Sequence, residues 1–430
     1  MDQILEGKAF IDNSFHDCCI GITDGKIVDI KKIISGPNRK IFSKRLILPA
    51  GIDIHVHFRD PGFPQKEDFY TGSLSAAFGG ISCICDMPNT KPFTASTDTL
   101  KEKNSIAQKK SVIDYGLYLG ITKNNLSELQ NIHALCCGFK LFLGKTTESN
   151  EIDTESLSSV FKNVSDINKI LAVHAEDANC LDKHRKKEST LHDHASGRPE
   201  ICEVTSIEKL LSIHSETNIR LHICHISSAA AMKILYKRNR SITVGVTPHH
   251  IFLNIEIEHR LPSYFKVNPP IRQMHDKDFL MNSLKMGKID VVESDHAPHT
   301  CDEKENEFHS APAGLPGVET MFPMLLAKAR EDKIALSSVI RNCAHRPAEI
   351  MGVSKGQIAV GKDADFCIID YNNIQNIKEE NLHSKCKWSP FNGLKAIFPS
   401  DVYVRGSAVI SDYVFVGEKG FGKNFVSQGA

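Results

Sequence analysis

Two histidines stand two positions apart in the stretch "DIHVHFRDPG", residues 53 to 62. In a β-strand, residues i and i+2 point to the same face, so His55 and His57 should project side by side, with Asp53 behind them. Imidazole nitrogens are frequent ligands of zinc. Taken alone, such a pair is more often structural than metal-binding, so the interpretation depends on what other residues reach the same place.

Further candidate ligands lie at the ends of other apolar segments: His174 in "VHAED", His225 in "CHISS" and Asp295 in "ESDHAPH". Four imidazoles and a carboxylate form a donor set that suits zinc. Lys140 in "GFKLFLG" needs a separate explanation, because an ammonium group cannot bind a metal. Either it lies elsewhere, at the surface or in a salt bridge, or its amine carries a carbamate, which is anionic and can bridge two metals.

The fold must bring these residues together, and the order of apolar segments predicts how. Short segments that are apolar on both faces alternate with longer stretches compatible with helices, which favours parallel βα units and, with eight of them, a (β/α)8 barrel over residues 50–352. The catalytic side chains of such barrels gather at the carboxyl ends of the strands. The eight predicted strands lie in residues 46–56, 81–88, 112–120, 138–144, 169–177, 218–228, 241–250 and 288–299.

Both ends of the chain have β character instead. Residues 8–34 read as alternating strands, with an Asp-Gly turn in "TDGK" (23–26) between "CCIGI" and "IVDI". Strand-like segments return after residue 352. We therefore predict a small β-sandwich domain built from residues 1–49 and 353–430, beside the barrel.

The composition excludes several classes of partner. The 430 residues carry 52 Lys plus Arg and 52 Asp plus Glu, so no net field attracts nucleic acid or an acidic membrane surface. No apolar run approaches the ~18 residues of a membrane span, and the N-terminus lacks the apolar core of a signal peptide. Thirteen cysteines, an odd number without a CxxC, are interpreted as reduced thiols. We expect a cytoplasmic protein.

Eight motifs together resemble one family along nearly the whole chain: "DIHVHFRDPG", "DMPNTKP", "FKLFLG", "VHAED", "KVNPPIR", "DHAPHTCDEK", "APAGLPGVET" and "SPFNG". They are similar to the class I dihydroorotases of the amidohydrolase superfamily. The resemblance implies that His55, His57 and Asp295 hold a first zinc and that His174 and His225 hold a second. A carboxylated Lys140 and a hydroxide would bridge them, with Asp295 as the proton shuttle; one zinc remains an alternative to two.

The same resemblance implies the substrate and its contacts. The reaction would be the reversible cyclisation of N-carbamoyl-L-aspartate to (S)-dihydroorotate in pyrimidine biosynthesis. Arg59, two residues beyond His57, would bind the ring carboxylate, because a guanidinium matches a carboxylate in shape and charge. The other implied substrate contacts are Asn89, Asn268, His299 and the backbone around Ala313 and Gly314.

Two features depart from the family pattern. Glu293 stands where the family usually has Gly or Ala before "SDHAPH", so its carboxylate must point away from the metals or be paired. The segment "GKTTESNEID" (144–153), expected to form the lid, is not glycine-rich.

Alternative functions remain. Allantoinase and hydantoinase or dihydropyrimidinase use similar barrels on rings without a carboxylate, but generally lack the arginine at position 59 and the asparagine at position 89. An inactive scaffold for aspartate transcarbamoylase would typically have lost metal ligands. A homodimer, or a complex of the active enzyme with aspartate transcarbamoylase, also fits the resemblance.

Overall fold

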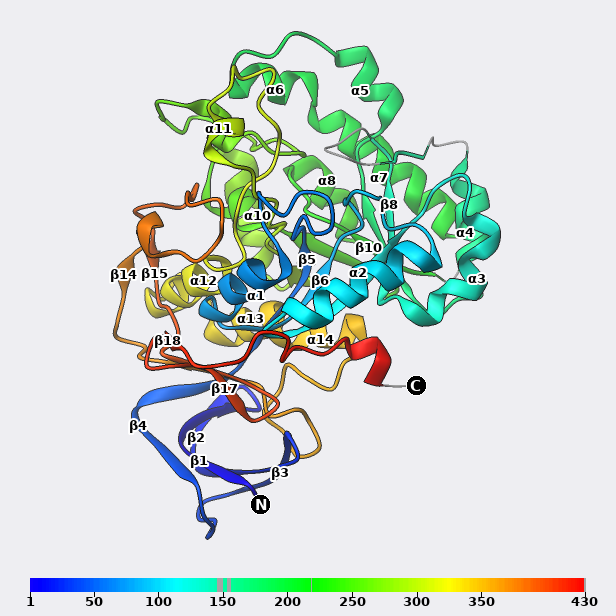
Figure 1. The fold of residues 1–430 in the computed structure, drawn as a ribbon. Coiled ribbons are helices and arrows are strands. Elements are labelled where there is room, and N and C mark those ends of the chain that lie inside the picture. Colours follow the sequence, from blue (N-terminus) through cyan, green and yellow to red (C-terminus); the bar gives the residue numbers. More distant parts are fainter. Residues whose placement is uncertain (145–149, 153–155, 218, 429–430) are drawn as a thin grey trace.

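Two eight-stranded sheets organise the chain (Figure 1). The computed structural model describes residues 1–144, 150–152, 156–217 and 219–428, so most of the segment expected to form the lid lies outside the described residues. None of the helices in the described ranges combines the length and apolar character that a membrane span requires.

The first sheet is the predicted barrel. Its strands pair in parallel in the order of the sequence, and every one of them is almost entirely buried, which explains their continuously apolar sequences. The His57 N–H donates to the carbonyl of His296 over 2.8 Å and brings the first strand to the chain that follows the last. The strands are β5 (Gly51–Val56), β6 (Ile81–Asp86), β7 (Asp114–Gly120), β8 (Gly138–Phe142), β9 (Ile170–His174), β10 (Arg220–Ile223), β11 (Ile242–Val246) and β12 (Val291–Val292).

Helices surround this barrel (Figure 1), as the alternating pattern predicts. Side chains that cap helix starts help to fix them: Asp68 accepts hydrogen bonds from the N–H groups of Tyr70 and Thr71. The helices are α1 (Phe69–Phe78), α2 (Thr97–Lys110), α3 (Leu129–Ile132), α4 (Leu157–Val164), α5 (Ala178–His184), α6 (Leu191–Gly197), α7 (Glu200–His214), α8 (Ala229–Leu235), α9 (Pro248–Phe252), α10 (Met274–Lys285), α11 (Cys301–Lys304), α12 (Met321–Arg330), α13 (Leu336–Ile340) and α14 (Arg346–Met351).

The second sheet contains strands from both ends of the chain, as predicted, in the order β18-β17-β16-β13-β4-β1-β2-β3. The Asp24-Gly25 turn joins β2 to β3, with φ of 50° and 73°. One predicted strand is divided: residues 46–49 belong to this sheet, and the barrel begins at Gly51. The strands are β1 (Gln3–Ile11), β2 (Ser14–Thr23), β3 (Lys26–Lys31), β4 (Arg39–Pro49), β13 (Phe366–Ile369), β16 (Asp401–Val404), β17 (Ser407–Ser411) and β18 (Val414–Phe415); β14 (Gln375–Asn376) pairs with β15 (Lys395–Ala396) separately.

A buried lysine links the two sheets. Lys355 is 2% exposed, and its Nζ lies 2.8 Å from Asp114 at the start of β7, 2.7 Å from Asp365 and 3.1 Å from Asp363. The carboxylates raise the pKa of Lys355 although burial opposes the charge. Removing one partner of such a buried ion pair strongly destabilises a fold, since the remaining buried charge is left uncompensated.

The expectation that all cysteines are reduced is wrong for one pair. Cys180 in α5 and Cys202 in α7 form a disulfide, with 5.2 Å between their Cα atoms. The two residues are 22 positions apart in the sequence and share no motif, so their spacing gave no signal. The other eleven cysteines are free.

Candidate metal centre and active site

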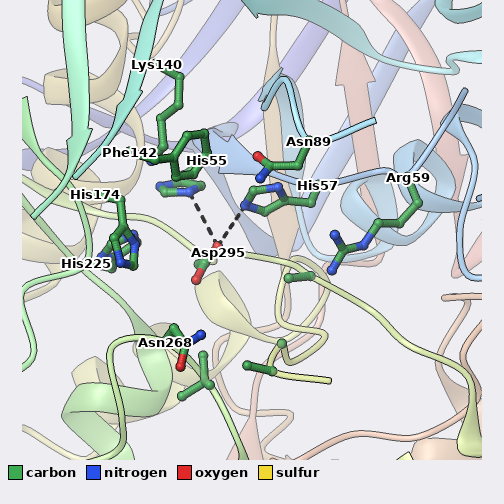
Figure 2. A pocket seen from close by; sticks show the side chains of 14 residues that line it. His55, His57, Arg59, Asn89, Lys140, Phe142, His174, His225, Asn268 and Asp295 are labelled. Atoms are coloured by element: carbon green, nitrogen blue, oxygen red, sulfur yellow. Dashed lines mark hydrogen bonds and ion pairs between the residues drawn. The ribbon is translucent and has the colours of Figure 1, made fainter. Parts of the chain in front are cut away.

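A small cavity opens at the carboxyl ends of the barrel strands (Figure 2). Every predicted site residue except His299 lines it, and Phe142, Val267 and Ala297 complete its wall. Side chains from strands far apart in the sequence therefore meet in one place.

Three predicted ligands meet on one side of the cavity. Asp295 Oδ1 lies 3.1 Å from His57 Nε2 and 3.4 Å from His55 Nε2 (dashed lines in Figure 2). Two ligands at ~2.0–2.1 Å from a tetrahedral zinc would lie about 3.3 Å from each other. The separations therefore fit ligands of a common metal ion.

The other two histidines meet beside them. His174 Nδ1 lies 3.2 Å from His225 Nε2, again the separation of two ligands on one metal. The opposite nitrogen of His174, Nε2, is 2.9 Å from Glu176, which also pairs with Arg198. A carboxylate at one ring nitrogen fixes the ring and leaves the other nitrogen free to bind a metal.

Burial makes these imidazoles suitable ligands. It lowers the pKa of His55 to about 4 and holds the pKa values of His57 and His225 well below the usual range. Burial also lowers the pKa of His174, against the opposing effect of Glu176. The rings are therefore neutral near pH 7, and metal ligation requires the neutral form.

Lys140 reaches the same cavity from β8 and is fully buried. Its Nζ lies 3.3 Å from Cys224 Sγ and 5.1 Å from the centre of the Phe142 ring. Among the described residues, no carboxylate lies within ion-pair distance of this Nζ. A buried ammonium group beside neutral histidines is unfavourable, whereas a carbamate on the same nitrogen would supply a negative charge to the metal position.

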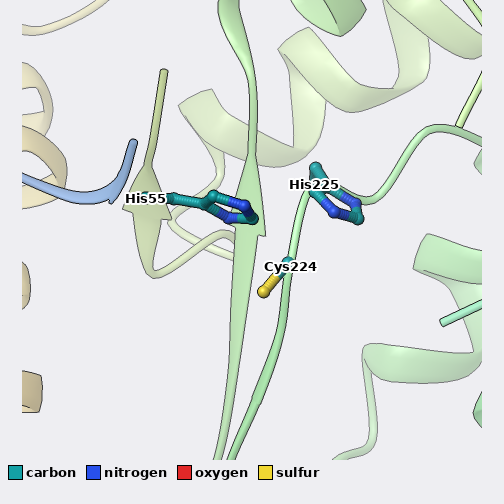
Figure 3. Close-up of side chains that lie close together, drawn as sticks. All are labelled: His55, Cys224 and His225. Atoms are coloured by element: carbon teal, nitrogen blue, oxygen red, sulfur yellow. The ribbon is translucent and has the colours of Figure 1, made fainter. Parts of the chain in front are cut away.

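Cys224 is a neighbour that the sequence analysis did not identify. Ligand atoms of His55, Cys224 and His225 all lie within 4.8 Å of one another, and Figure 3 shows the thiol beside the two rings. Burial raises the pKa of Cys224 to about 12, so the group is a thiol at neutral pH. Its position directly before His225 in the sequence was the only available signal.

The backbone is left-handed at three predicted site residues: Arg59 (φ 62°), His225 (φ 37°) and Asp295 (φ 46°). For residues other than glycine this conformation costs of order 1–3 kcal/mol, and it tends to cluster at functional sites. The surrounding structure therefore holds these side chains at angles that a regular strand would not provide.

Glu293 is paired, as its position required. Its Oε1 accepts the backbone N–H of His225 over 2.7 Å, and its Oε2 lies 3.1 Å from His222 Nε2 and 3.4 Å from His55 Nδ1. Burial works against the charged form, but His222 and His55 hold the pKa of Glu293 below its usual range. The carboxylate lies on the Nδ1 side of His55, a predicted ligand, and Glu293 is not among the residues that line the cavity.

Arg59 lies at the edge of the cavity and is 2% exposed. Its Nε donates to the carbonyl of Pro298 over 3.3 Å, and its Nη2 lies 3.1 Å from His299 Nε2. Burial and Arg59 lower the pKa of His299 to about 3, so the neutral ring can accept this hydrogen bond. His299 thus lies behind Arg59 rather than in the cavity wall. Lys66 and Glu303, which the sequence analysis missed, both lie against His299.

The remaining predicted contacts line the cavity. Asn268 Oδ1 is buried without a hydrogen-bond partner in the described part of the chain, so it can accept one from a ligand. The N–H of Gly314 donates to the carbonyl of Lys266 over 2.9 Å, and the carbonyl of Gly314 accepts from Lys304 Nζ over 3.2 Å, so the backbone here is held in place from both sides. A Cβ at Gly314 would overlap the carbonyl of Ala297, so this close approach requires glycine.

Residues 46–409 match the Amidohydrolase family. The chain belongs to this family. It is 37% identical to a dihydroorotase of Methanosarcina acetivorans, over 95% of this chain and 91% of that protein. It is also 37% identical to a dihydroorotase of Thermoplasma acidophilum, over 96% of this chain and 95% of that protein.

Solved structures of amidohydrolases share the fold. An L-hydantoinase (dihydropyrimidinase) from Arthrobacter aurescens superposes with a TM-score of 0.94 at 25% identity, over 98% of both chains. A D-hydantoinase superposes with a TM-score of 0.92 at 26% identity, over 99% of both chains. The predicted fold class and superfamily are thereby confirmed, and the family is metal-dependent.

Proposed function

We propose that this protein is a zinc-dependent dihydroorotase that interconverts N-carbamoyl-L-aspartate and (S)-dihydroorotate. The observation that carries the proposal is Arg59, a buried guanidinium at the edge of the metal cavity. A ring carboxylate is the group by which dihydroorotate differs from the substrates of hydantoinases and allantoinases. The full-length similarity to dihydroorotases supports the same conclusion.

The donor set supports two metal positions. His55, His57 and Asp295 would hold the first zinc, His174 and His225 the second, and a carboxylated Lys140 would bridge them. When bound, zinc makes water nucleophilic at neutral pH and polarises the carbonyl that is attacked. The neutral imidazoles and the ligand separations fit this metal without rearrangement of the strands.

Asp295 is the residue placed to move protons. Its Oδ1 lies beside the predicted ligands His55 and His57, and Asp295 lines the cavity, where its carboxylate would face both the attacking water and the leaving ring nitrogen of a bound substrate. In hydrolysis, Asp295 accepts a proton from the water and returns it to the nitrogen as the ring amide breaks. In cyclisation Asp295 begins protonated: the carbamoyl nitrogen bonds to the carboxylate carbon, and the departing oxygen takes one proton from Asp295 and one from that nitrogen and leaves as water. Because closure converts a dianion to a monoanion, it consumes one proton and is favoured by acid pH.

The rest of the cavity holds the substrate. Arg59 would bind the ring carboxylate with Asn89, while His299 fixes the guanidinium from behind. Asn268 and the backbone of Ala313 and Gly314 would contact the amide groups of the ring. These contacts orient the reacting carbonyl toward the ligands, and orientation of this kind contributes substantially to catalysis.

Substrate comparison tests the proposal. The zinc-loaded protein is offered dihydroorotate, hydantoin, dihydrouracil and allantoin separately, and kcat/KM is measured for each. We expect a strong preference for dihydroorotate, with only slow turnover of the neutral rings. Preference for hydantoin or dihydrouracil would assign the chain to the second candidate function, which the structural similarity to hydantoinases favours.

The proposal extends to metal content and assembly. Elemental analysis of fresh protein should find two zincs per chain, and electron density at Lys140 Nζ should show the carbamate. We further propose a homodimer and a complex with aspartate transcarbamoylase. Light scattering of the protein, alone and mixed with that enzyme, distinguishes these assemblies from a monomer.

A further inference from the structure

Glu293 touches the backs of two predicted metal ligands that belong to different metal positions. Its Oε1 accepts the backbone N–H of His225 over 2.7 Å, and its Oε2 lies 3.4 Å from Nδ1 of His55. The residue is fully buried and stands two positions before Asp295, a third predicted ligand. A single carboxylate therefore reaches both halves of the centre from behind.

The neighbouring strand β11 is shaped to receive this carboxylate. A Cβ at Gly245 would overlap Glu293 Oε1 and would lie 2.6 Å from its Cδ, so only glycine leaves the space. His222 on β10 holds the other side, with Nε2 at 3.1 Å from Glu293 and Nδ1 at 2.9 Å from Thr243 Oγ1. Residues of β10 and β11 thus form a closed space around the Glu293 side chain, which we call the Glu293 seat.

The Glu293 seat determines which nitrogen of His55 can face a metal. Nδ1 of His55 faces Glu293, whereas Nε2 faces Asp295 Oδ1 at 3.4 Å. A carboxylate beside Nδ1 keeps the ring proton there and leaves the lone pair on Nε2 for the metal. At His174 the order is reversed and the carboxylate is closer: Glu176 is hydrogen-bonded to Nε2 over 2.9 Å, compared with the 3.4 Å contact at His55, and Nδ1 of His174 faces His225. Each metal position therefore has one histidine backed by a carboxylate.

We propose that Glu293, seated over Gly245 and held by His222, is a positioning residue that fixes the ring of His55 and the backbone of His225 for metal binding. The proposal rests on the metal centre of the proposed function but not on the identity of the substrate. Loss of such a partner behind a ligand typically costs 10–100-fold in metal affinity.

The test measures metal binding in Glu293→Gln, which keeps the shape of the side chain but removes its charge. Zinc affinity is determined by competition with a chromophoric chelator, and the visible spectrum is recorded after Co²⁺ replaces zinc. We expect about 10–100-fold weaker binding of zinc and an altered Co²⁺ spectrum. Affinity within twofold of the parent protein together with an unchanged spectrum would overturn the proposal.

Glu319→Gln is the matched control. Glu319 is also a buried carboxylate held by a histidine and a backbone N–H, both from His383, but it contacts no predicted ligand. The control should retain parental zinc affinity. An equal loss in both variants would show a general effect of removing buried charge and would overturn the positioning role.

A variant of Gly245 tests the same contact a second way. Gly245→Ala places a Cβ in the space of the Glu293 carboxylate, so it should lower zinc affinity in the parent protein but cause no further loss in Glu293→Ala, where that space is empty. Equal losses in the two backgrounds would overturn the proposal. Because these readouts require no substrate, failure of the dihydroorotase assay would leave them intact.

Discussion

Replacement of Arg59 by alanine should remove the preference for a ring carboxylate. Arg59 is 2% exposed. If its guanidinium is removed, little water is therefore available to solvate the carboxylate of a bound substrate. Loss of one partner of a buried, hydrogen-bonded charge pair costs about 2–5 kcal/mol. At about 1.4 kcal/mol per factor of ten, kcat/KM for dihydroorotate should fall by roughly 30-fold to several thousand-fold.

For Arg59→Lys, kcat/KM for dihydroorotate should lie between the values of the parent protein and of Arg59→Ala. Lysine keeps the positive charge, but it lacks the planar fork with which Arg59 contacts Pro298, His299 and a carboxylate at the same time. Losing one hydrogen bond to a charged group costs about 1.5–3 kcal/mol, which predicts roughly a 10- to 150-fold decrease. The backbone at position 59 is already left-handed with arginine, so alanine or lysine at this position adds no further backbone strain.

The assay follows hydrolysis of dihydroorotate and of neutral dihydrouracil by both variants, with zinc content measured in parallel. Because dihydrouracil lacks the carboxylate, its slow turnover should change little, and only the ratio of the two substrates should collapse. The reasoning would be refuted if both rates fell together with zinc still bound, or if the rate on dihydroorotate stayed at its parental value.

Three further predictions follow from the structure. Asp295→Asn should retain dihydroorotate binding, measured by calorimetry, while kcat falls about 10²–10⁴-fold because the proton carrier is lost; a robustly active variant contradicts this role. Lys140→Gln cannot form a carbamate and should reduce zinc from two to about one per chain by elemental analysis; two retained zincs would exclude a bridging role. Lys355→Met should lower the free energy of unfolding in urea by about 3–5 kcal/mol, because it removes the lysine from the buried Asp365, whereas Asp114 and Asp363 keep Arg405 and Lys26. Lys26→Met, at a side chain 48% exposed in its pair with Asp363, should cost less than about 1 kcal/mol, and equal losses in the two variants would contradict the linking role of Lys355.

The barrel was predictable because its signal is local. Each strand is buried on both faces, so each appears in the sequence as a short apolar run, and the candidate ligands stand at the ends of these runs. The domain boundaries predicted from the same pattern, at residues 49 and 352, remain a prediction. Division of the first predicted strand between two sheets was not visible, since residues 46–56 are apolar on both sides of the break.

Contacts between distant segments could not be predicted. Lys355 with its aspartates, and the disulfide between Cys180 and Cys202, depend on where helices and loops pack after the fold has formed. Isolated lysines and cysteines occur throughout this sequence, so none of these residues was distinctive. Cys224 could not be predicted for a related reason, because it is distinguished only by its contact with Lys140 on another strand.

Glu293 shows how a residue that departs from a family pattern becomes intelligible only with its neighbour. In the sequence it was an unexplained acid near the ligands, and Gly245 was an unremarkable glycine inside an apolar strand. The structure joins them, because the missing side chain at position 245 provides the space that the carboxylate at position 293 fills. The pair should therefore be mutated together, and their effects on zinc affinity should not add.

Arg59 lines the cavity, but the strand pattern does not explain how it gets there. The alternation of a strand would set Arg59 on the same face as His57, but β5 ends at Val56. The direction of the guanidinium instead comes from the left-handed backbone at Arg59, with φ of 62°, and from its hydrogen bonds to Pro298 and His299 beyond β12. The chain that follows β12 thus supplies both Asp295 and the support for Arg59. In the proposed reaction, substrate selection and proton transfer would therefore depend on one loop, and a change in that loop should alter both together.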